Sequence, residues 1–164
     1  MGISVQISKE SPLIAIEDLA KKNDWGLLWS DRDEIMLEVK GHWTENQVFL
    51  IWRPESKILH MSASLGLQVL GEQRSNVCEL LATINERQWA GHFDLCSKEG
   101  ELYFRHSLVG VDPKNISADF LEEMIDIGIK EAAVQYPVFD LALSNEKTTQ
   151  HALNLAMLDV AGNA

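Results

Sequence analysis

Helical spacing is the first pattern along the chain. Between Leu13 and Ala20, apolar residues recur three or four positions apart, behind Ser11, a residue type that commonly caps helices, and Pro12, which suits the first helical turn. Two lysines follow at residues 21 and 22, where the helix dipole favours positive charge. The pattern predicts a short helix over residues 12–22.

Strand periodicity replaces this spacing further along. Aliphatic residues occupy every second position from Ile35 to Val39, which is the period of a half-buried strand. Segments 47–53 and 57–65 are rich in apolar and β-branched residues and are separated by Pro54, which cannot donate a ladder hydrogen bond. These segments predict a hairpin with its loop at residues 54–57. Its expected cross-strand pairs are Trp52 with Leu59, Leu50 with Met61, and Val48 with Ala63.

A second helix is predicted from residue 72, because Val77, Leu80, Leu81, Ile84 and Gln88 fall on one side of it. Trp89 is expected to end this helix, and Gly91 supplies the backbone freedom that is common just beyond a helix. Segments 92–97 and 101–109 then predict another hairpin. With a two-residue turn at Glu99 and Gly100, the expected pairs are Asp94 with Arg105, Leu95 with Phe104, and Phe93 with His106.

The segment 85–95, "NERQWAGHFDL", combines residues that could act in acid–base chemistry with residues that shape a helix-to-strand corner. No nucleophile accompanies them at a suggestive spacing, so we interpret the segment as structural. The same applies to the Asp94–Arg105 pair, which would penalise a slip in strand register. The residues given this structural role are Trp89, Gly91, His92, Asp94 and Arg105.

The clearest helix is predicted from Ser117, its N-cap, to Tyr136, with Pro137 closing it. Gly128 lies within its apolar stripe and indicates a close approach by a neighbouring element. Residues 138–144 are expected to form a short strand and residues 148–160 a last amphipathic helix. The apolar stripe of the long helix is expected to comprise Phe120, Leu121, Met124, Ile125, Gly128 and Ala132, and that of the last helix to include Ala152, Leu155 and Ala156.

This order of elements predicts the α+β class, with an antiparallel sheet flanked by helices. The strands follow one another too closely for the crossovers of a parallel, doubly wound sheet. With 164 residues and neither a repeat nor a linker, we expect a single domain over residues 1–164 with its core at about 12–158.

Composition restricts the partners. Fourteen basic residues against 25 acidic residues give a net charge of −11, which repels nucleic acid and anionic lipid surfaces. The sequence has no apolar stretch long enough to span a membrane and no signal-peptide pattern at its start, so we expect a cytoplasmic protein. Cys78 and Cys96 lack metal-site or disulfide spacing and are expected to be buried, reduced thiols.

Catalytic and metal-binding patterns are weak. The five histidines are scattered without H-x-E or H-E-x-x-H spacing. Neither a glycine-rich phosphate loop nor a G-x-S-x-G motif occurs. We therefore expect no catalytic residue, no metal and no cofactor.

Three segments resemble the YbjN family, bacterial proteins described as sensory-transduction regulators with a fold like that of type III secretion chaperones. They are "FLIWRPESKILHMSASLGLQV", "CELLATINERQWAGHFDLCSKEGELYFRHSLVG" and "MIDIGIKEAAVQYPVF", and the resemblance runs from about Pro12 to Leu158. It implies an α+β domain that can dimerise and bind other proteins, without a catalytic residue. "LALSNEKTT" departs from many relatives because it lacks a tryptophan–glycine pair. The most specific residues are Asn85, Glu86, Trp89, Gly91, His92, Phe93, Phe104, Arg105, Tyr136 and Pro137.

Two functions remain open. The first is a non-enzymatic adaptor, regulator or chaperone-like module that binds a protein client, or a second copy of itself, through its sheet face. The second is a regulatory domain that senses a small ligand in a pocket between helices and sheet. The candidate protein-binding residues are Trp25, Trp29, Trp43, Phe49 and Ile51, which could alternatively belong to the core.

Overall fold

The computed structural model describes residues 11–144, 151, 152, 154, 155 and 157. Six strands form one antiparallel sheet in the order β1-β2-β3-β4-β6-β5. The α+β class and the antiparallel sheet are confirmed, whereas the likeness to type III secretion chaperones stays a prediction. The strands are β1 (Gly26–Ser30), β2 (Glu34–Lys40), β3 (Glu45–Arg53), β4 (Ile58–Gln68), β5 (His92–Leu95) and β6 (Glu101–Val109).

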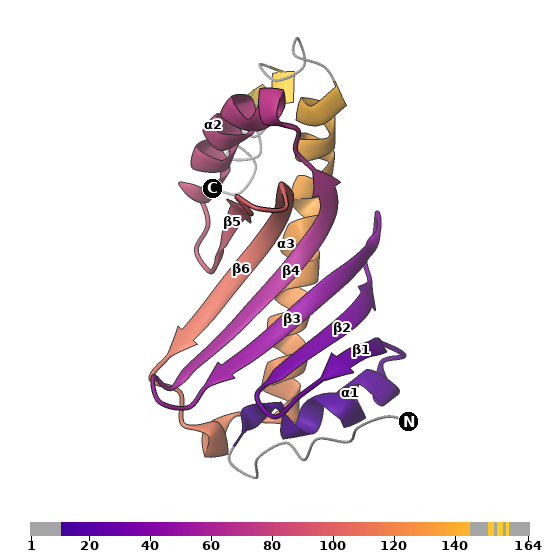
Figure 1. Ribbon diagram of the computed structural model, residues 1–164, viewed down its shortest axis with the longest axis vertical. Coiled ribbons are helices and arrows are strands. Elements are labelled where there is room, and N and C mark those ends of the chain that lie inside the picture. Colours follow the sequence, from indigo (N-terminus) through magenta and orange to yellow (C-terminus); the bar gives the residue numbers. More distant parts are fainter. Residues whose placement is uncertain (1–10, 145–150, 153, 156, 158–164) are drawn as a thin grey trace.

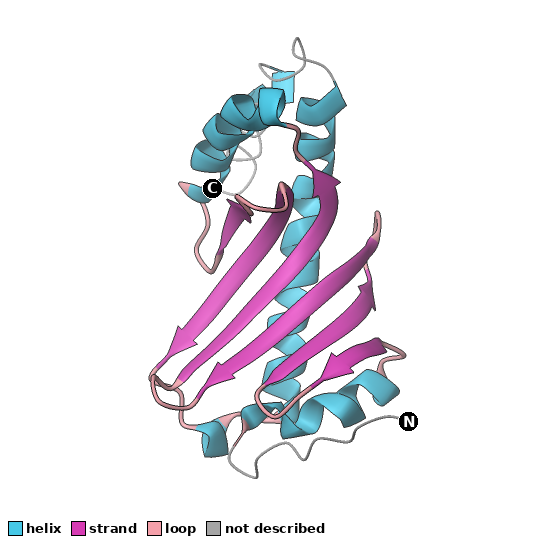
Figure 2. Ribbon diagram, in the orientation of Figure 1, coloured by secondary structure: helices cyan, strands magenta, loops and turns pink. Residues whose placement is uncertain are grey.

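Helices cover one face of this sheet. Figure 1 shows α3 running along the whole sheet behind it, with α1 near the β1 end and α2 near the β5 end. Figure 2 shows strands, and no helix, across the middle of the opposite face. We call this opposite face the open face. The helical elements are η1 (Pro12–Ala15), α1 (Ile16–Lys22), η2 (Gly71–Gln73), α2 (Arg74–Asn85), η3 (Pro113–Asn115) and α3 (Ala118–Ser144).

The first helix and the first hairpin agree with the sequence predictions. The backbone N–H of Leu13 donates to the Ser11 hydroxyl, and the helical residues begin at Pro12 as a 3-10 turn that continues into α1. All three predicted pairs between β3 and β4 are present. These strands pack an alternating set of buried aliphatic side chains against α3, which is the pattern that fixed their register.

The predicted register of the second hairpin is wrong by two residues. Asp94 lies opposite Tyr103, not Arg105, and Phe93 lies opposite Phe104. The loop is longer than a two-residue turn: the N–H of Cys96 donates to the Glu101 carbonyl, and the N–H of Gly100 donates to the Cys96 carbonyl. A shift of two residues keeps every side chain on its face. Asp94 and Arg105 therefore still form an ion pair, diagonally, with 3.2 Å between Oδ2 and Nε.

Two expectations about α2 also need correction. The helix ends at Asn85 rather than at Trp89, because tighter hydrogen bonds from residues 87 and 88 to the carbonyls of residues 84 and 85 close it. Its buried residues are the predicted apolar ones, except that Gln88 lies beyond the helix. Cys78 is exposed on the outer side of α2 and Cys96 is half-buried, so the thiols are free but not both buried.

The long helix α3 overturns the prediction of a helix end at Pro137 followed by a strand. It continues to Ser144, because Val138, Phe139 and Ala142 are buried and keep this segment packed. The close approach expected at Gly128 is confirmed, since an added Cβ would lie 2.5 Å from Met61 Cε. Phe120, placed on the buried stripe by its spacing, is instead 38% exposed.

The bond that Pro137 leaves unmade is replaced from another element. Proline has no backbone N–H, so the carbonyl four residues earlier, that of Ala133, loses its helical donor. Trp43, in the β2–β3 turn, donates its indole Nε1–H to this carbonyl over 2.9 Å. Its ring also stacks on Tyr136 with 6.1 Å between centroids and 12° between planes. Trp43 thereby stabilises a proline-containing helix that sequence alone predicts to stop.

The predicted last helix falls partly outside the described residues. Residues 151, 152, 154, 155 and 157 are helical, as expected, and Ala152 is buried. Residue 156 and the connection at residues 145–149 lie outside the described part of the chain.

Candidate functional site

The open face carries a row of large apolar side chains. Strand pairing places Trp29 opposite Met36, Met36 opposite Phe49, and Phe49 opposite Ser62. Ile51 lies two residues beyond Phe49 on the same strand and therefore on the same face. We call Trp29, Met36, Phe49 and Ile51 the apolar row. Trp29 is exposed and the other three side chains are half-buried, so the row is a partly exposed apolar surface on the side of the sheet away from α3.

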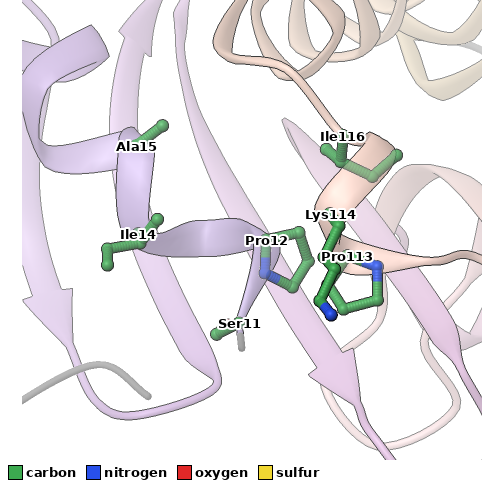
Figure 3. A pocket seen from close by; sticks show the side chains of 7 residues that line it. All are labelled: Ser11, Pro12, Ile14, Ala15, Pro113, Lys114 and Ile116. Atoms are coloured by element: carbon green, nitrogen blue, oxygen red, sulfur yellow. The ribbon is translucent and has the colours of Figure 1, made fainter. Parts of the chain in front are cut away.

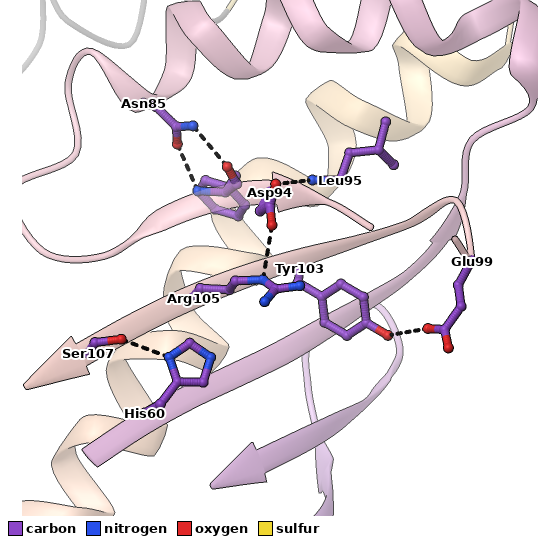
Figure 4. Close-up of polar contacts among 9 residues, drawn as sticks. His60, Asn85, Asp94, Leu95, Glu99, Tyr103, Arg105 and Ser107 are labelled. Carbon is purple, nitrogen blue, oxygen red and sulfur yellow. Dashed lines mark hydrogen bonds and ion pairs between the residues drawn. The ribbon is translucent and has the colours of Figure 1, made fainter. Parts of the chain in front are cut away.

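Polar and cationic groups border the row on β4 and β6. Figure 4 shows His60 beside Ser107, with 2.7 Å between Nδ1 and Oγ, and Arg105 between Asp94 and Tyr103. The Arg105 guanidinium carbon lies 5.4 Å from the centre of the Tyr103 ring. Burial lowers the pKa of His60, and the positive charge of Arg105 lowers it further. His60 is therefore neutral at neutral pH, which makes this border less cationic than its composition suggests.

Tyr103 is tied to acidic residues next to the same border. Its hydroxyl donates to Glu101 over 2.8 Å, and the Ser64 hydroxyl donates to the same carboxylate. Burial, followed by the hydrogen bond to Glu101, raises the pKa of Tyr103, so the phenol stays protonated. The tyrosine is a hydrogen-bond donor here, and the arrangement fixes the side chains of β4 and β6 relative to each other.

The corner segment 85–95 has a clear structural geometry. Asn85 bonds Phe93 twice: its amide nitrogen donates to the Phe93 carbonyl over 2.8 Å, and its oxygen accepts the Phe93 N–H over 2.7 Å (Figure 4). Asn85 thus occupies the outer edge of β5 as a neighbouring strand would. Gly91 has φ +74, and an added Cβ would lie 2.5 Å from Phe104 Cζ and 2.6 Å from the Arg105 carbonyl oxygen.

The other corner residues are more exposed than a packing role requires. His92 is exposed opposite Arg105, and Trp89 is fully exposed in the loop that follows α2. The geometry around this corner comes from Asn85 and Gly91, and sequence reasoning named only the second of them as structural. The signal for Asn85 was its position at the helix end, where a short amide side chain reaches nearby backbone groups.

Of the five candidate protein-binding residues, the fold brings three together. Trp29, Phe49 and Ile51 share the open face. Trp25 precedes β1 and packs partly buried against the core, and Trp43 bonds to α3. Met36 completes the apolar row but was missed, although the alternation of the β2 segment already placed it on the face opposite to Ile35 and Leu37.

A separate cavity of about 330 Å³ lies between η1 and η3 rather than between helices and sheet. Figure 3 shows its lining from the two 3-10 turns, mostly apolar with Lys114 as the cation. Among the described residues, histidine, cysteine, aspartate and glutamate form no group of three that could hold a metal ion. In the same part of the chain, no helix is long and apolar enough to cross a membrane.

Comparison with known families gives a match over most of the chain. Residues 12–141 match the family YbjN, described as "Putative bacterial sensory transduction regulator". The chain belongs to the YbjN family. The YbjN match covers all six strands and most of α3. It ends at residue 141, whereas the resemblance was expected to extend to about residue 158. The description names a regulator and no enzymatic activity. The chain has no significant match among curated proteins or solved structures.

Proposed function

We propose that this YbjN chain is a non-enzymatic regulator that binds a segment of a client protein on its open sheet face. The apolar row is the observation that supports this proposal. Trp29 is 47% exposed and the other three members are half-buried, and β1 exposes three consecutive large apolar residues at the sheet edge, Leu27, Leu28 and Trp29. Contiguous apolar surface that stays partly exposed in this way is typical of binding sites.

The chemistry of the face indicates the kind of segment it would bind. Its centre is apolar, and its charged residues are largely paired, Arg53 with Glu34 over 3.0 Å and Arg105 with Asp94 over 3.2 Å. Affinity would therefore come from burying apolar side chains of the client, with the polar border setting its orientation. The net charge of −11 disfavours an acidic client through long-range repulsion.

The test is capture of the client and its loss on substitution within the row. The tagged chain is incubated with extract of its native cells, bound proteins are identified by mass spectrometry, and the captured protein is purified and titrated against Phe49→Asp and Ile51→Asp. Leu70→Asp is the matched control, because Leu70 is an exposed leucine, 60% accessible, outside the apolar row. Circular dichroism verifies that each variant is folded.

We expect the two row variants to weaken binding at least tenfold, or about 1.4 kcal/mol, because a carboxylate would be desolvated in an apolar contact. Leu70→Asp should bind like the unsubstituted chain. Equal affinity for all variants would contradict a role of the open face in client binding.

The cavity between η1 and η3 supports a second proposal, a regulator that senses a small, largely apolar ligand with one anionic group. Its size suits a small molecule, and Lys114 provides the counter-charge. A ligand bound to the native state raises the melting temperature by mass action. A metabolite panel should then contain a compound that stabilises the chain but not an Ala15→Trp variant, whose larger side chain would fill the cavity. Stabilisation of both to the same extent would place the ligand elsewhere.

A further inference from the structure

The two edges of the sheet differ in how their backbone groups are covered. At the β5 edge, the Asn85 side chain bonds both the N–H and the carbonyl of Phe93. At the opposite edge (Figure 1), the backbone of Gly26–Ser30 pairs only with β2 among the described residues. We call the outer side of Gly26–Ser30 the β1 edge. Its free N–H and carbonyl groups can hydrogen-bond to another extended segment.

Large apolar side chains line the β1 edge on both faces of the sheet. Leu27 pairs with Leu37, which is buried on the α3 side, whereas Trp29 pairs with Met36 on the open face. A β-bulge at Leu28 produces this change of face. Leu27, Leu28 and Trp29 are 44%, 45% and 47% exposed, and β1 contains none of the lysines or prolines that commonly protect an edge strand. A strand added here would bury apolar surface on both sides of the sheet.

Acidic side chains without a paired cation stand at both ends of the β1 edge. Asp24 precedes β1 and Asp31 follows it directly; both are exposed, and neither forms an ion pair within the described part of the chain. On β2, Glu38 lies opposite Gly26 and Lys40 lies two residues further on, so these two charges balance each other. The two aspartates therefore leave negative charge at each end of the edge. The cations near them in sequence are already in ion pairs, Lys21 with Asp18, Lys22 with Glu122 and Arg32 with Asp33.

We propose that the β1 edge binds an extended segment of another protein as an additional strand, and that this segment has a run of apolar residues between two basic ones. Main-chain hydrogen bonds would supply affinity, and side chains would supply selectivity. Because Leu27 and Trp29 face opposite sides, the run must be apolar at consecutive positions, whereas an alternating strand would match only one face. The basic residues would lie near Asp24 and Asp31, no more than about 23 Å apart in an extended chain.

The same charges disfavour a second copy of this chain at the β1 edge. Antiparallel pairing of two β1 strands would bring Asp24 near Asp31 of the copy, and parallel pairing would bring each aspartate near its own counterpart. Like charges opposite each other destabilise strand pairing. The net charge of −11 on each copy adds long-range repulsion. A segment with basic ends meets neither penalty.

The experiment is an NMR titration of the full isotope-labelled chain with the acetylated, amidated peptide Lys-Ser-Val-Leu-Ile-Val-Ser-Lys. We expect saturable shifts of the amide signals of Gly26–Ser30, and little change at Phe93 on the capped edge. A matched peptide with N-methyl groups on two adjacent central residues keeps the side chains but loses an N–H on each of its own edges, and it should bind at least tenfold more weakly. Absence of shifts in β1, or equal binding of the methylated peptide, would overturn strand addition.

Charge variants test the basic ends. Asp31→Asn removes the charge, while its side-chain oxygen can still accept the Arg32 N–H, and it should weaken binding of the lysine peptide by about two- to threefold, as expected for one exposed ion pair. Glu72→Gln removes the same charge at η2 and should leave binding unchanged. A peptide with glutamate at both ends should bind about fivefold more weakly than the lysine peptide, or worse. Equal binding of the two peptides would refute the selection for basic ends.

Two further controls separate this site from a second copy and from the open face. Shifts of the Gly26–Ser30 signals that grow with chain concentration, without peptide, would place a second copy at the β1 edge and overturn the proposal. Phe49→Asp should bind the peptide like the unsubstituted chain, because a strand added to β1 lies three strand spacings, or about 14 Å, from β3. Loss of peptide binding in Phe49→Asp would place the peptide on the open face instead. Client capture on the open face and peptide binding at the β1 edge can therefore fail independently.

Discussion

The hydrogen bond from Trp43 to the Ala133 carbonyl allows the strongest test of how this fold is stabilised. Trp43→Phe removes the indole N–H while leaving an aromatic ring that can still stack on Tyr136. The carbonyl then has no donor, because Pro137 provides none. An unsatisfied buried polar group costs about 1–3 kcal/mol. Trp43 is 54% exposed, so water can reach this site, and we expect about 1 kcal/mol.

The cost of Trp43→Phe can be compared with its cost in a chain that also carries Pro137→Ala. Alanine restores a backbone N–H four residues after Ala133, so the helix itself can donate to the carbonyl. Trp43→Phe should therefore cost much less in the Pro137→Ala background than in the unsubstituted chain, with a coupling of about 1 kcal/mol. Pro137→Ala alone should be neutral or stabilising, because alanine favours the helix interior and proline disfavours it.

The assay is urea unfolding followed by far-ultraviolet circular dichroism, since tryptophan fluorescence would change with the substitution itself. The four chains of the cycle give two values for the cost of Trp43→Phe. Equal costs in both backgrounds would show that the indole N–H does not replace the missing helical donor, and the reasoning would be refuted.

Three further predictions concern the corner and the border of the open face. Gly91→Ala should lower the free energy of unfolding by about 2–4 kcal/mol, which is more than Gly110→Ala should. Both glycines have positive φ, but only at Gly91 would an added Cβ meet backbone and ring atoms; urea unfolding of both variants checks this. Asn85→Ala should cost about 1–3 kcal/mol and increase amide hydrogen exchange at Phe93, whereas unchanged protection would contradict the edge role of Asn85. Because folding lowers the pKa of His60, the unfolded chain takes up a proton on this side chain at a higher pH than the folded chain does. The free energy of unfolding should therefore decrease as pH falls below about 6.5, and His60→Gln should make that decrease smaller in pH-dependent unfolding.

The sequence predicts the register of the β3–β4 hairpin correctly because only one face of these strands carries the large buried apolar side chains. A slip by one position would expose Leu50 and bury Arg53, so alternation and loop length agree. The β5–β6 hairpin lacks this constraint. A glycine with positive φ at position 100 suits both a two-residue turn and the longer loop, and a shift of two residues leaves all faces unchanged. Nothing local distinguishes the two registers.

The extent of α3 was unpredictable for a different reason. Proline normally ends a helix because a carbonyl loses its donor, and that rule is sound for the local chain. Here the replacement donor, Trp43, lies 90 residues from Ala133 in sequence. Non-local contacts of this kind override local propensity without leaving a local pattern.

The candidate site was predictable in part, because alternation assigns a face but not a neighbour. Alternation along β3 puts Phe49 and Ile51 on the face opposite Leu50, as observed, whereas spacing could not show that Trp43 turns back onto α3. Phe120 illustrates the same limit. Its spacing fits the buried stripe of α3, and only the position of the sheet shows that its side chain is exposed.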